Sequence, residues 1–140
     1  MNKTQIILSD QALDLNQAFN FTKDPSCGAI ECFIGTVRNH NKGEEVNRLE
    51  FSAYKPMAIK EMQKIADQCL QRFEIKKIAI HHAIGSLEIG EIPVIIAVSS
   101  AHKEAAQQAC SYAIKTLKET VPIWKKEFTT KGHVWINAHP

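Results

Sequence analysis

The sequence predicts an α+β fold, a two-layer sandwich of helices on a mostly antiparallel sheet. Two long segments, residues 56–73 and 100–121, carry apolar residues at helical spacings of three and four. Shorter segments between and after them have the alternating or continuous apolar pattern of strands. The chain of 140 residues contains no repeat, linker or low-complexity tract. We therefore expect one domain over residues 1–140.

The N-terminal part predicts three strands and one short helix. Residues 4–8 form a short apolar run, and Ser9 or Asp10 can cap a weak helix after it. Residues 26–37 and 46–54 show strand patterns on either side of a polar turn. We expect these two strands to pair as a hairpin with a longer loop.

Proline and serine mark the starts of the two long helices. Pro56 suits the first helical position, and the apolar stripe after it continues to Phe73. Ser100 is expected to cap the second long helix, which Pro122 ends. Residues 86–91 are expected to form a turn. The remaining strands are predicted at residues 75–85, 92–100, 123–129 and 133–137.

Composition excludes several classes of protein. A net charge of +2 is too small to indicate nucleic-acid binding, and 44% hydrophobic residues are typical of a globular protein. No stretch approaches the roughly 18 apolar residues of a membrane span, and the N-terminus has no signal-peptide pattern. We expect a cytoplasmic protein without membrane contact, metal or cofactor. The four cysteines lack C-x-x-C spacing and are expected to be reduced thiols.

Cationic residues stand at two places where an anion could bind. Arg38 follows the strand of residues 26–37, and its planar guanidinium suits a pair of phosphate oxygens. His102 and Lys103 lie in the first turn of the second long helix, where free N–H groups attract anions. The alternatives are a solvated turn at Arg38 and ordinary tolerated charges at the helix start.

A third place joins the end of this helix to the next strand. Lys118 follows Lys115 by one turn and has no carboxylate three or four positions before it, whereas Lys125 shares a strand face with Glu127. A lysine that acts as a base near neutral pH needs a pKa about three units below its usual value of about 10.4, and a glutamate neighbour opposes this. Lys118 is therefore the better candidate base or nucleophile, and Lys125 the better fixed charge. A solvated basic face is the alternative.

Two further expectations concern neighbouring side chains. Trp124 and Phe128 lie on the other face of the strand that carries Lys125, and we expect them to anchor it in the core. His81 and His82 adjoin on a strand and so point to opposite faces. They are poor joint metal ligands, and we expect neither to have a functional role.

Four segments carry a combined signal. They are FIGTVRNHNKGEEVNRLEFSAYKPMA, IHHAIGSLEIGE, VSSAHKEA and LKETVPIWKKEF. In this order and spacing they resemble the large, catalytic subunit of molybdopterin synthase, and the resemblance covers residues 6–135. It implies an α/β hammerhead-type fold and an enzyme that converts cyclic pyranopterin monophosphate (precursor Z) to molybdopterin by installing two dithiolene sulfurs. It also implies a small ubiquitin-like partner with a thiocarboxylated C-terminal Gly-Gly tail, in a heterotetramer built on a homodimer of large subunits.

The resemblance implies site residues as well. Lys118 and Lys125 match the two lysines at the family's reacting centre. His102 and Lys103 are candidates to reach the pocket from the opposite protomer, and Lys103 stands where many relatives have arginine, whose bidentate geometry it lacks. The residues implied to bind or line the substrate site are Thr36, Val37, Arg38, His102, Lys103, Lys126 and Glu127.

Two other functions compete with this one. A non-catalytic dimeric module that binds a small anion or nucleotide would share the cationic pocket. Nucleic-acid binding would need a basic stripe with exposed aromatic residues. Because acidic residues intersperse the lysines, we rank it last.

Overall fold

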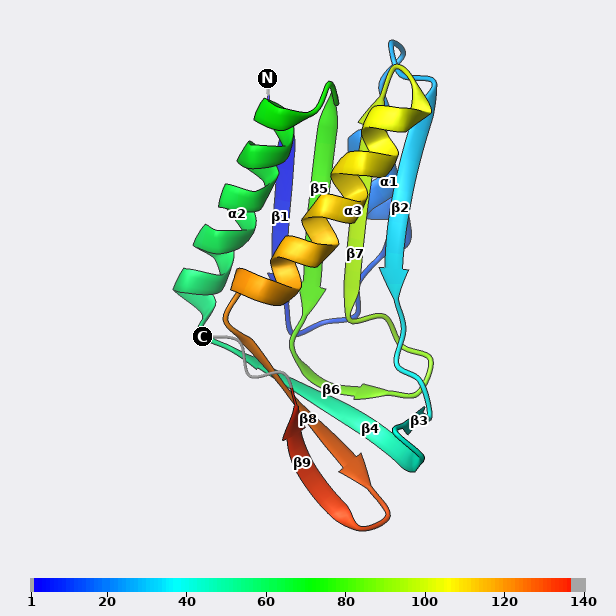
Figure 1. Cartoon of the computed structure of the whole chain (residues 1–140), viewed down its shortest axis with the longest axis vertical. Helices are drawn as coiled ribbons and strands as arrows, with labels where there is room; N and C mark the ends of the chain where they lie inside the picture. Colours follow the sequence, from blue (N-terminus) through cyan, green and yellow to red (C-terminus); the bar gives the residue numbers. More distant parts are fainter. Residues whose placement is uncertain (1, 137–140) are drawn as a thin grey trace.

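The computed structural model describes residues 2–136 and confirms the α+β class (Figure 1). In its four-stranded first sheet β1 runs parallel to β5, while the β5–β7 and β7–β2 pairs are antiparallel. The mostly antiparallel sheet is therefore as predicted. In spatial order its strands are β1 (Thr4–Ser9), β5 (Lys77–Ala83), β7 (Val94–Ser100) and β2 (Ala29–Gly35).

The two long helices, α2 (Lys55–Arg72) and α3 (Lys103–Thr120), cover one face of this sheet (Figure 1). Their apolar stripes pack on β5 and β7, where Met62, Ile80 and Ile96 are fully buried. The short α1 (Leu15–Thr22) lies on the opposite face through Ala18. Apolar burial on this scale is the main stabilising term for a domain of this size.

A second sheet crosses the lower end of the first (Figure 1). Its long central strand, β4 (Glu44–Ala53), pairs antiparallel with β8 (Ile123–Thr129) and, over part of its length, with β6 (Gly85–Glu88). The chain enters β8 directly from α3, because Pro122 stops the helix just after the Val121 N–H donates to the Leu117 carbonyl. The strands are β3 (His40–Asn41), β4 (Glu44–Ala53), β6 (Gly85–Glu88), β8 (Ile123–Thr129) and β9 (Gly132–Ile136).

The predicted pairing of residues 26–37 with 46–54 as a hairpin was wrong. β2 pairs with β7 in the first sheet, whereas β4 pairs with β8 in the second. The polar segment between them carries the chain from one sheet to the other. Residues 86–91 were also wrong as a turn, because their first half belongs to β6. The prediction of a strand at 133–137 corresponds to β9, and Asn137 lies outside the described residues.

Both predicted helix caps were misplaced. α1 is capped by Asp14, whose carboxylate accepts a hydrogen bond from the Asn16 N–H at 2.9 Å, and Ser9 still belongs to β1. α3 begins at Lys103 with His102 in the cap position. Ser100 ends β7, yet its hydroxyl accepts a hydrogen bond from the Ala106 N–H at 3.2 Å. Within residues 2–136, no helix has the length and apolarity to cross a membrane.

His81 and His82 are both buried in β5 and point to opposite faces. A ring nitrogen of His81, Nε2, lies 2.8 Å from the Gln5 side-chain oxygen, and His82 Nδ1 lies 2.7 Å from the Ala83 carbonyl oxygen. Burial lowers the pKa of both imidazoles, and that of His82 to about 4. Both side chains are therefore neutral at pH 7.

We expect the free energy of unfolding to fall as the pH is lowered from 7 to 5. The unfolded chain binds protons at its histidines near pH 6.5, whereas folded His82 does so only near pH 4, so acid favours the unfolded state. At 1.36 kcal/mol per pKa unit, His82 alone contributes a loss of about 2 kcal/mol over this interval. Urea unfolding of the wild type and His82→Gln at both pH values checks this. The loss should be about 2 kcal/mol smaller in the variant, and equal losses would contradict the expectation.

Candidate active site

The end of α3 and the start of β8 enclose a pocket of about 120 Å³. Lys118 comes from the last turn of the helix and Lys125 from the strand, and the sharp stop at Pro122 brings these two elements together. Two ammonium groups in an otherwise mostly apolar pocket suit an anionic ligand. The pocket is lined by Phe51, His82, Leu117, Lys118, Val121, Ile123 and Lys125.

The environment of Lys125 favours its neutral amine more than the sequence indicated. Burial lowers the pKa of Lys125, Glu127 raises it, and the positive charges of Lys118 and Arg38 lower it. Glu127 acts in the direction that the sequence indicated, but burial outweighs it, so that the net change in the Lys125 pKa is downward. Strand alternation shows that the two side chains share a face, but it does not show that this face is covered.

A chain of hydrogen bonds links Arg38 to Glu127 across the edge of this site. An Arg38 Nη2 group donates to the Asn41 side-chain oxygen at 3.1 Å, and Asn41 Nδ2 donates to Glu127 Oε2 at 2.9 Å. Glu127 is only 6% exposed, and a buried carboxylate is costly without such donors. Asn41 is a residue that the sequence analysis missed. Its only signal was its place three residues after Arg38 in the same polar segment.

The structure does not bring Val37 or Lys126 to the pocket. Val37 is 2% exposed and packs in a core cluster with Val46 and Leu49, while Thr36 before it is exposed. The Lys126 ammonium lies on the opposite face of β8, 4.7 Å from the centre of the Trp135 ring. These contacts leave both side chains turned away from the two lysines.

The aromatic face of β8 is also not the core face. Trp124 and Phe128 are half-buried and lie outside the core clusters, so the expectation that they anchor the strand in the core was wrong. The Arg48 guanidinium instead covers the Phe128 ring at 3.7 Å. The buried face of β8 carries Ile123, which packs in the main core with Leu117 and Val121, and Glu127, which accepts a hydrogen bond from Asn41.

His102 and Lys103 lie far from the two lysines within one chain. Both are exposed at the start of α3, while Lys118 is in its last turn. At about 1.5 Å of rise per residue, the Cα atoms of Lys103 and Lys118 are roughly 22 Å apart. Figure 1 shows these two ends of α3 at opposite ends of the first sheet.

His82 lines the pocket, although the sequence predicted no functional role for it. It lies beside Phe51, with the two ring centres 5.2 Å apart in an edge-to-face arrangement. The adjacent His81 points to the other side of β5, toward Gln5 on β1. A pair of adjacent histidines on a strand therefore has one member at the site and one away from it.

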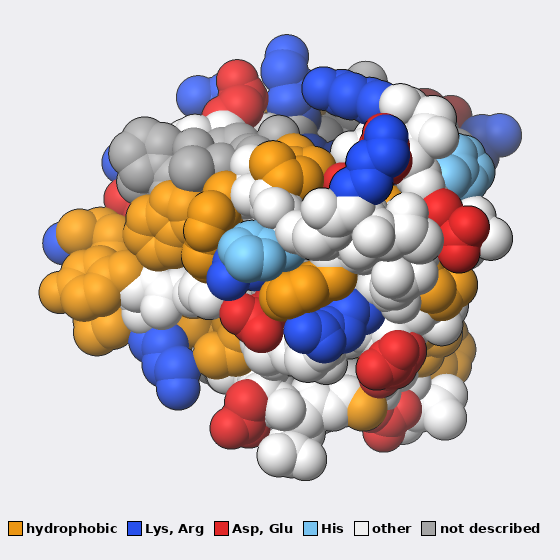
Figure 2. Space-filling view, turned by 90° about the horizontal axis from the view of Figure 1, so that it is seen from below, with side chains coloured by type: hydrophobic (Ala, Val, Ile, Leu, Met, Phe, Trp, Pro, Cys, Tyr) orange, Lys and Arg blue, Asp and Glu red, His pale blue; other side chains and the backbone are white. Residues whose placement is uncertain are grey.

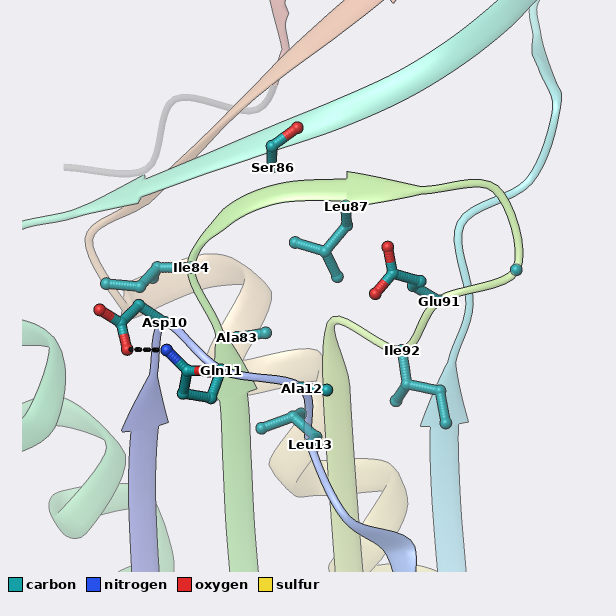
Figure 3. A pocket seen from close by; sticks show the side chains of 11 residues that line it. Asp10, Gln11, Ala12, Leu13, Ala83, Ile84, Ser86, Leu87, Glu91 and Ile92 are labelled. Atoms are coloured by element: carbon teal, nitrogen blue, oxygen red, sulfur yellow. Dashed lines mark hydrogen bonds between the residues drawn. The ribbon is translucent and has the colours of Figure 1, made fainter.

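A larger pocket, of about 340 Å³, lies between the loop after β1 and the segment from β5 to β7 (Figure 3). The carboxylates of Asp10 and Glu91 contribute to its lining, and Figure 3 shows Asp10 hydrogen-bonded to Gln11. Negative charges there oppose an anionic ligand, and the pocket contains no residue of the predicted site. In the described part of the chain, no group of three or more His, Cys, Asp or Glu side chains is arranged to hold a metal ion.

The end of the molecule that carries the second sheet exposes large apolar side chains. Figure 2 views this end from below and shows hydrophobic side chains gathered on one side of it, among charged ones. Tyr54 is 59% exposed, and Val134 and Trp135 on β9 are 50% and 51% exposed. Gathered apolar surface of this kind is typical of protein contacts.

The fold and the pocket together define a class of protein: a small α+β chain with two lysines at a partly apolar pocket whose charge suits an anionic ligand. A family model described as MoaE protein matches residues 8–120. The molybdopterin synthase catalytic subunit of Dictyostelium discoideum is 49% identical over 91% of this chain and 82% of its own length, and that of Homo sapiens is 42% identical over 96% and 71%. The structure of molybdopterin synthase from Staphylococcus aureus superposes with a TM-score of 0.88 at 39% identity, over 97% of this chain and 98% of that one. The chain belongs to the MoaE family, the enzymes named molybdopterin synthase catalytic subunit, which confirms the resemblance found in the sequence.

Titration of the Lys125 side chain by nuclear magnetic resonance is expected to give a pKa below 10.5. Glu127→Gln should lower this pKa further, because the carboxylate stabilises the ammonium form. Lys118→Ala should raise it, because a nearby positive charge is removed. Lys115→Ala, at an exposed position of α3, is the control and should leave it unchanged. Shifts of the same sign in the Glu127 and Lys118 variants would contradict this description of the pocket.

Proposed function

We propose that this chain is the catalytic subunit of a molybdopterin synthase and that the pocket between Lys118 and Lys125 is its reacting centre. The substrate is cyclic pyranopterin monophosphate, and the product is molybdopterin with two dithiolene sulfurs. Membership of the MoaE family supports this proposal. The observation that carries the site is the convergence of two lysines from different elements on one partly apolar pocket.

The side chains around the pocket have two kinds of role: some attract the substrate with positive charge, and one exchanges a proton or attacks. Both substrate and thiocarboxylate are anionic, and Lys118 and Arg38 attract them with positive charge. Lys125 is the better candidate for the amine that exchanges a proton or attacks, since burial lowers its pKa. This reverses the roles that the sequence favoured for the two lysines. Glu127, held by Asn41, limits how far the amine loses its proton.

The rest of the site comes from other chains. A volume of about 120 Å³ is below the roughly 300–1,000 Å³ of typical small-molecule pockets, so one chain encloses only part of a pterin. We propose that a second copy supplies His102 and Lys103, since these two residues lie far from the lysines of their own chain. The remaining opening admits the narrow Gly-Gly tail of a small ubiquitin-like subunit, which completes a heterotetramer.

We place this reaction in the cytoplasm. The cysteines are free thiols, two of them buried, as is typical of a reducing compartment.

Reconstitution tests the function directly. The chain is mixed with cyclic pyranopterin monophosphate and a small subunit whose C-terminus is a thiocarboxylate, and the dithiolene product is measured. The alternative function, a non-catalytic dimeric module for a small anion or nucleotide, predicts binding without product. A small subunit with an ordinary carboxylate is the negative control.

Lys118→Ala and Lys125→Ala should each lower single-turnover product formation by about a hundredfold or more, the usual contribution of a positioned acid–base group. Lys126→Ala is the matched control on the same strand, and its rate should stay within about threefold of wild type because its ammonium lies over Trp135. The measurement uses saturating substrate and partner, with folding checked by circular dichroism. Near wild-type rates for both pocket variants would refute this placement of the reacting centre.

Complementation between protomers tests the shared site. His102→Ala and Lys118→Ala chains are each expected to be nearly inactive alone. Random re-pairing in an equal mixture should restore about a quarter of wild-type activity, because half of the dimers then hold one intact site of two. No recovery despite measured exchange of protomers would place His102 and Lys118 in the same site of one chain, or His102 outside the site.

A further inference from the structure

His82 occupies a fixed position on the wall of the lysine pocket. Only 4% of its surface is exposed, and its ring packs edge-on against Phe51. Phe51 is the direct cross-strand neighbour of Lys125 in the β4–β8 pair. Phe51 therefore contacts the imidazole and lies opposite Lys125 on the neighbouring strand. This packing leaves the ring of His82 little freedom to turn away.

The hydrogen bond of His82 to the backbone determines which ring nitrogen carries the proton. A carbonyl oxygen can only accept, so Nδ1 must donate its hydrogen to the Ala83 carbonyl at 2.7 Å. In the neutral ring this leaves a lone pair on Nε2. Within residues 2–136, Nε2 has no hydrogen-bond partner, and it is not among the fully buried polar atoms that lack one. Among the described residues, therefore, no donor occupies this lone pair, and His82 is one of the side chains that line the pocket.

The other polar side chains that line this pocket are of the opposite kind. In their charged forms, which bind an anion, Lys118 and Lys125 donate hydrogen bonds and accept none. Among the lining side chains of the described chain, His82 alone offers an acceptor. With a pKa of about 4, its ring is also too weak a base to remove a proton at neutral pH, which leaves hydrogen bonding as its role.

We propose that His82 is a specificity-determining binding residue, whose Nε2 accepts a hydrogen bond from an N–H or O–H group of the ligand held between the two lysines. This inference rests on the proposed function, because the ligand is the pyranopterin, whose ring system carries such donors. The lysines recognise negative charge, and His82 distinguishes a donor-bearing anion from an anion without donors. Sulfate, which has no hydrogen to donate at neutral pH, is the comparison ligand.

Two substitutions separate this role from a structural one. His82→Asn retains an N–H group near the position of Nδ1 for the Ala83 carbonyl, but its shorter side chain has no acceptor at the position of Nε2. His82→Gln can place an amide oxygen near the position of Nε2. His81→Gln is the matched control, because it alters the adjacent buried histidine on the other face of β5. All chains are studied in complex with the small subunit.

Calorimetric titration with cyclic pyranopterin monophosphate should show affinity weakened about three- to tenfold in His82→Asn, the usual worth of one neutral hydrogen bond. His82→Gln should recover part of this loss, and His81→Gln should bind as wild type does. Sulfate should bind wild type and His82→Asn equally. Equal pyranopterin affinity in wild type and His82→Asn, or an equal loss for pyranopterin and sulfate, would overturn the inference.

A spectroscopic measurement on the wild type keeps the test independent of variant folding. The ¹⁵N resonance of His82 Nε2 should be that of an unprotonated nitrogen and should move upfield when the pyranopterin is added, while Nδ1 stays protonated. An unchanged Nε2 resonance in the saturated complex would overturn the inference. A wild type that neither binds pyranopterin nor forms product would instead refute the proposed function.

Discussion

The pairing of β8 with β4 is the constraint on which the site depends. Its register sets Ile123 opposite Ala53, Lys125 opposite Phe51 and Glu127 opposite Leu49. Because side chains alternate along a strand, a slip of one residue would turn Lys126 toward the pocket and expose Lys125 and Glu127. The register is fixed at its start by Pro122, whose carbonyl accepts a hydrogen bond from the Tyr54 N–H at 3.3 Å.

The register of β8 against β4 places two charged side chains, Lys125 and Glu127, at positions that are largely shielded from solvent. Glu127 is nearly enclosed, and its carboxylate is tolerated because Asn41 donates to it and Lys125 lies on the same face. Lys125 in turn is held in a half-buried position with Lys118 and Arg38 near enough to disfavour its charge. The packing of the first sheet offsets the energetic cost of burying these charges, and the pKa of Lys125 is lowered as a result of its position.

Much of the fold could be predicted from local pattern. The apolar stripe after Pro56 predicts a helix, and the continuous apolar run of β7 predicts a buried strand. The structure has both. Strand partners could not be predicted, because the alternation in residues 26–37 and 46–54 shows which side chains share a face and not which strand lies alongside. That is why the expected hairpin was replaced by pairs in two different sheets.

The same limit explains the errors at the site. Lys118 and Lys125 could be singled out from their unbalanced charges, but which face of β8 is covered depends on strands that are distant in sequence, such as β5, whose His82 lines the same pocket. Trp124 and Phe128 therefore looked like the core face, and His82 looked like an ordinary buried histidine. The separation of His102 from Lys118 follows from helix length and was available in the sequence, and it is the reason we propose that a second copy contributes His102.

We propose above all that an anionic pyranopterin binds between Lys118 and Lys125. The most direct test follows the side-chain resonances of all lysines by nuclear magnetic resonance as cyclic pyranopterin monophosphate is added to the complex. We expect saturable shifts at Lys118 and Lys125, with Lys126 unchanged on the far face of β8. Shifts confined to residues around the larger pocket of Asp10 and Glu91, with the two lysines unaffected, would contradict it.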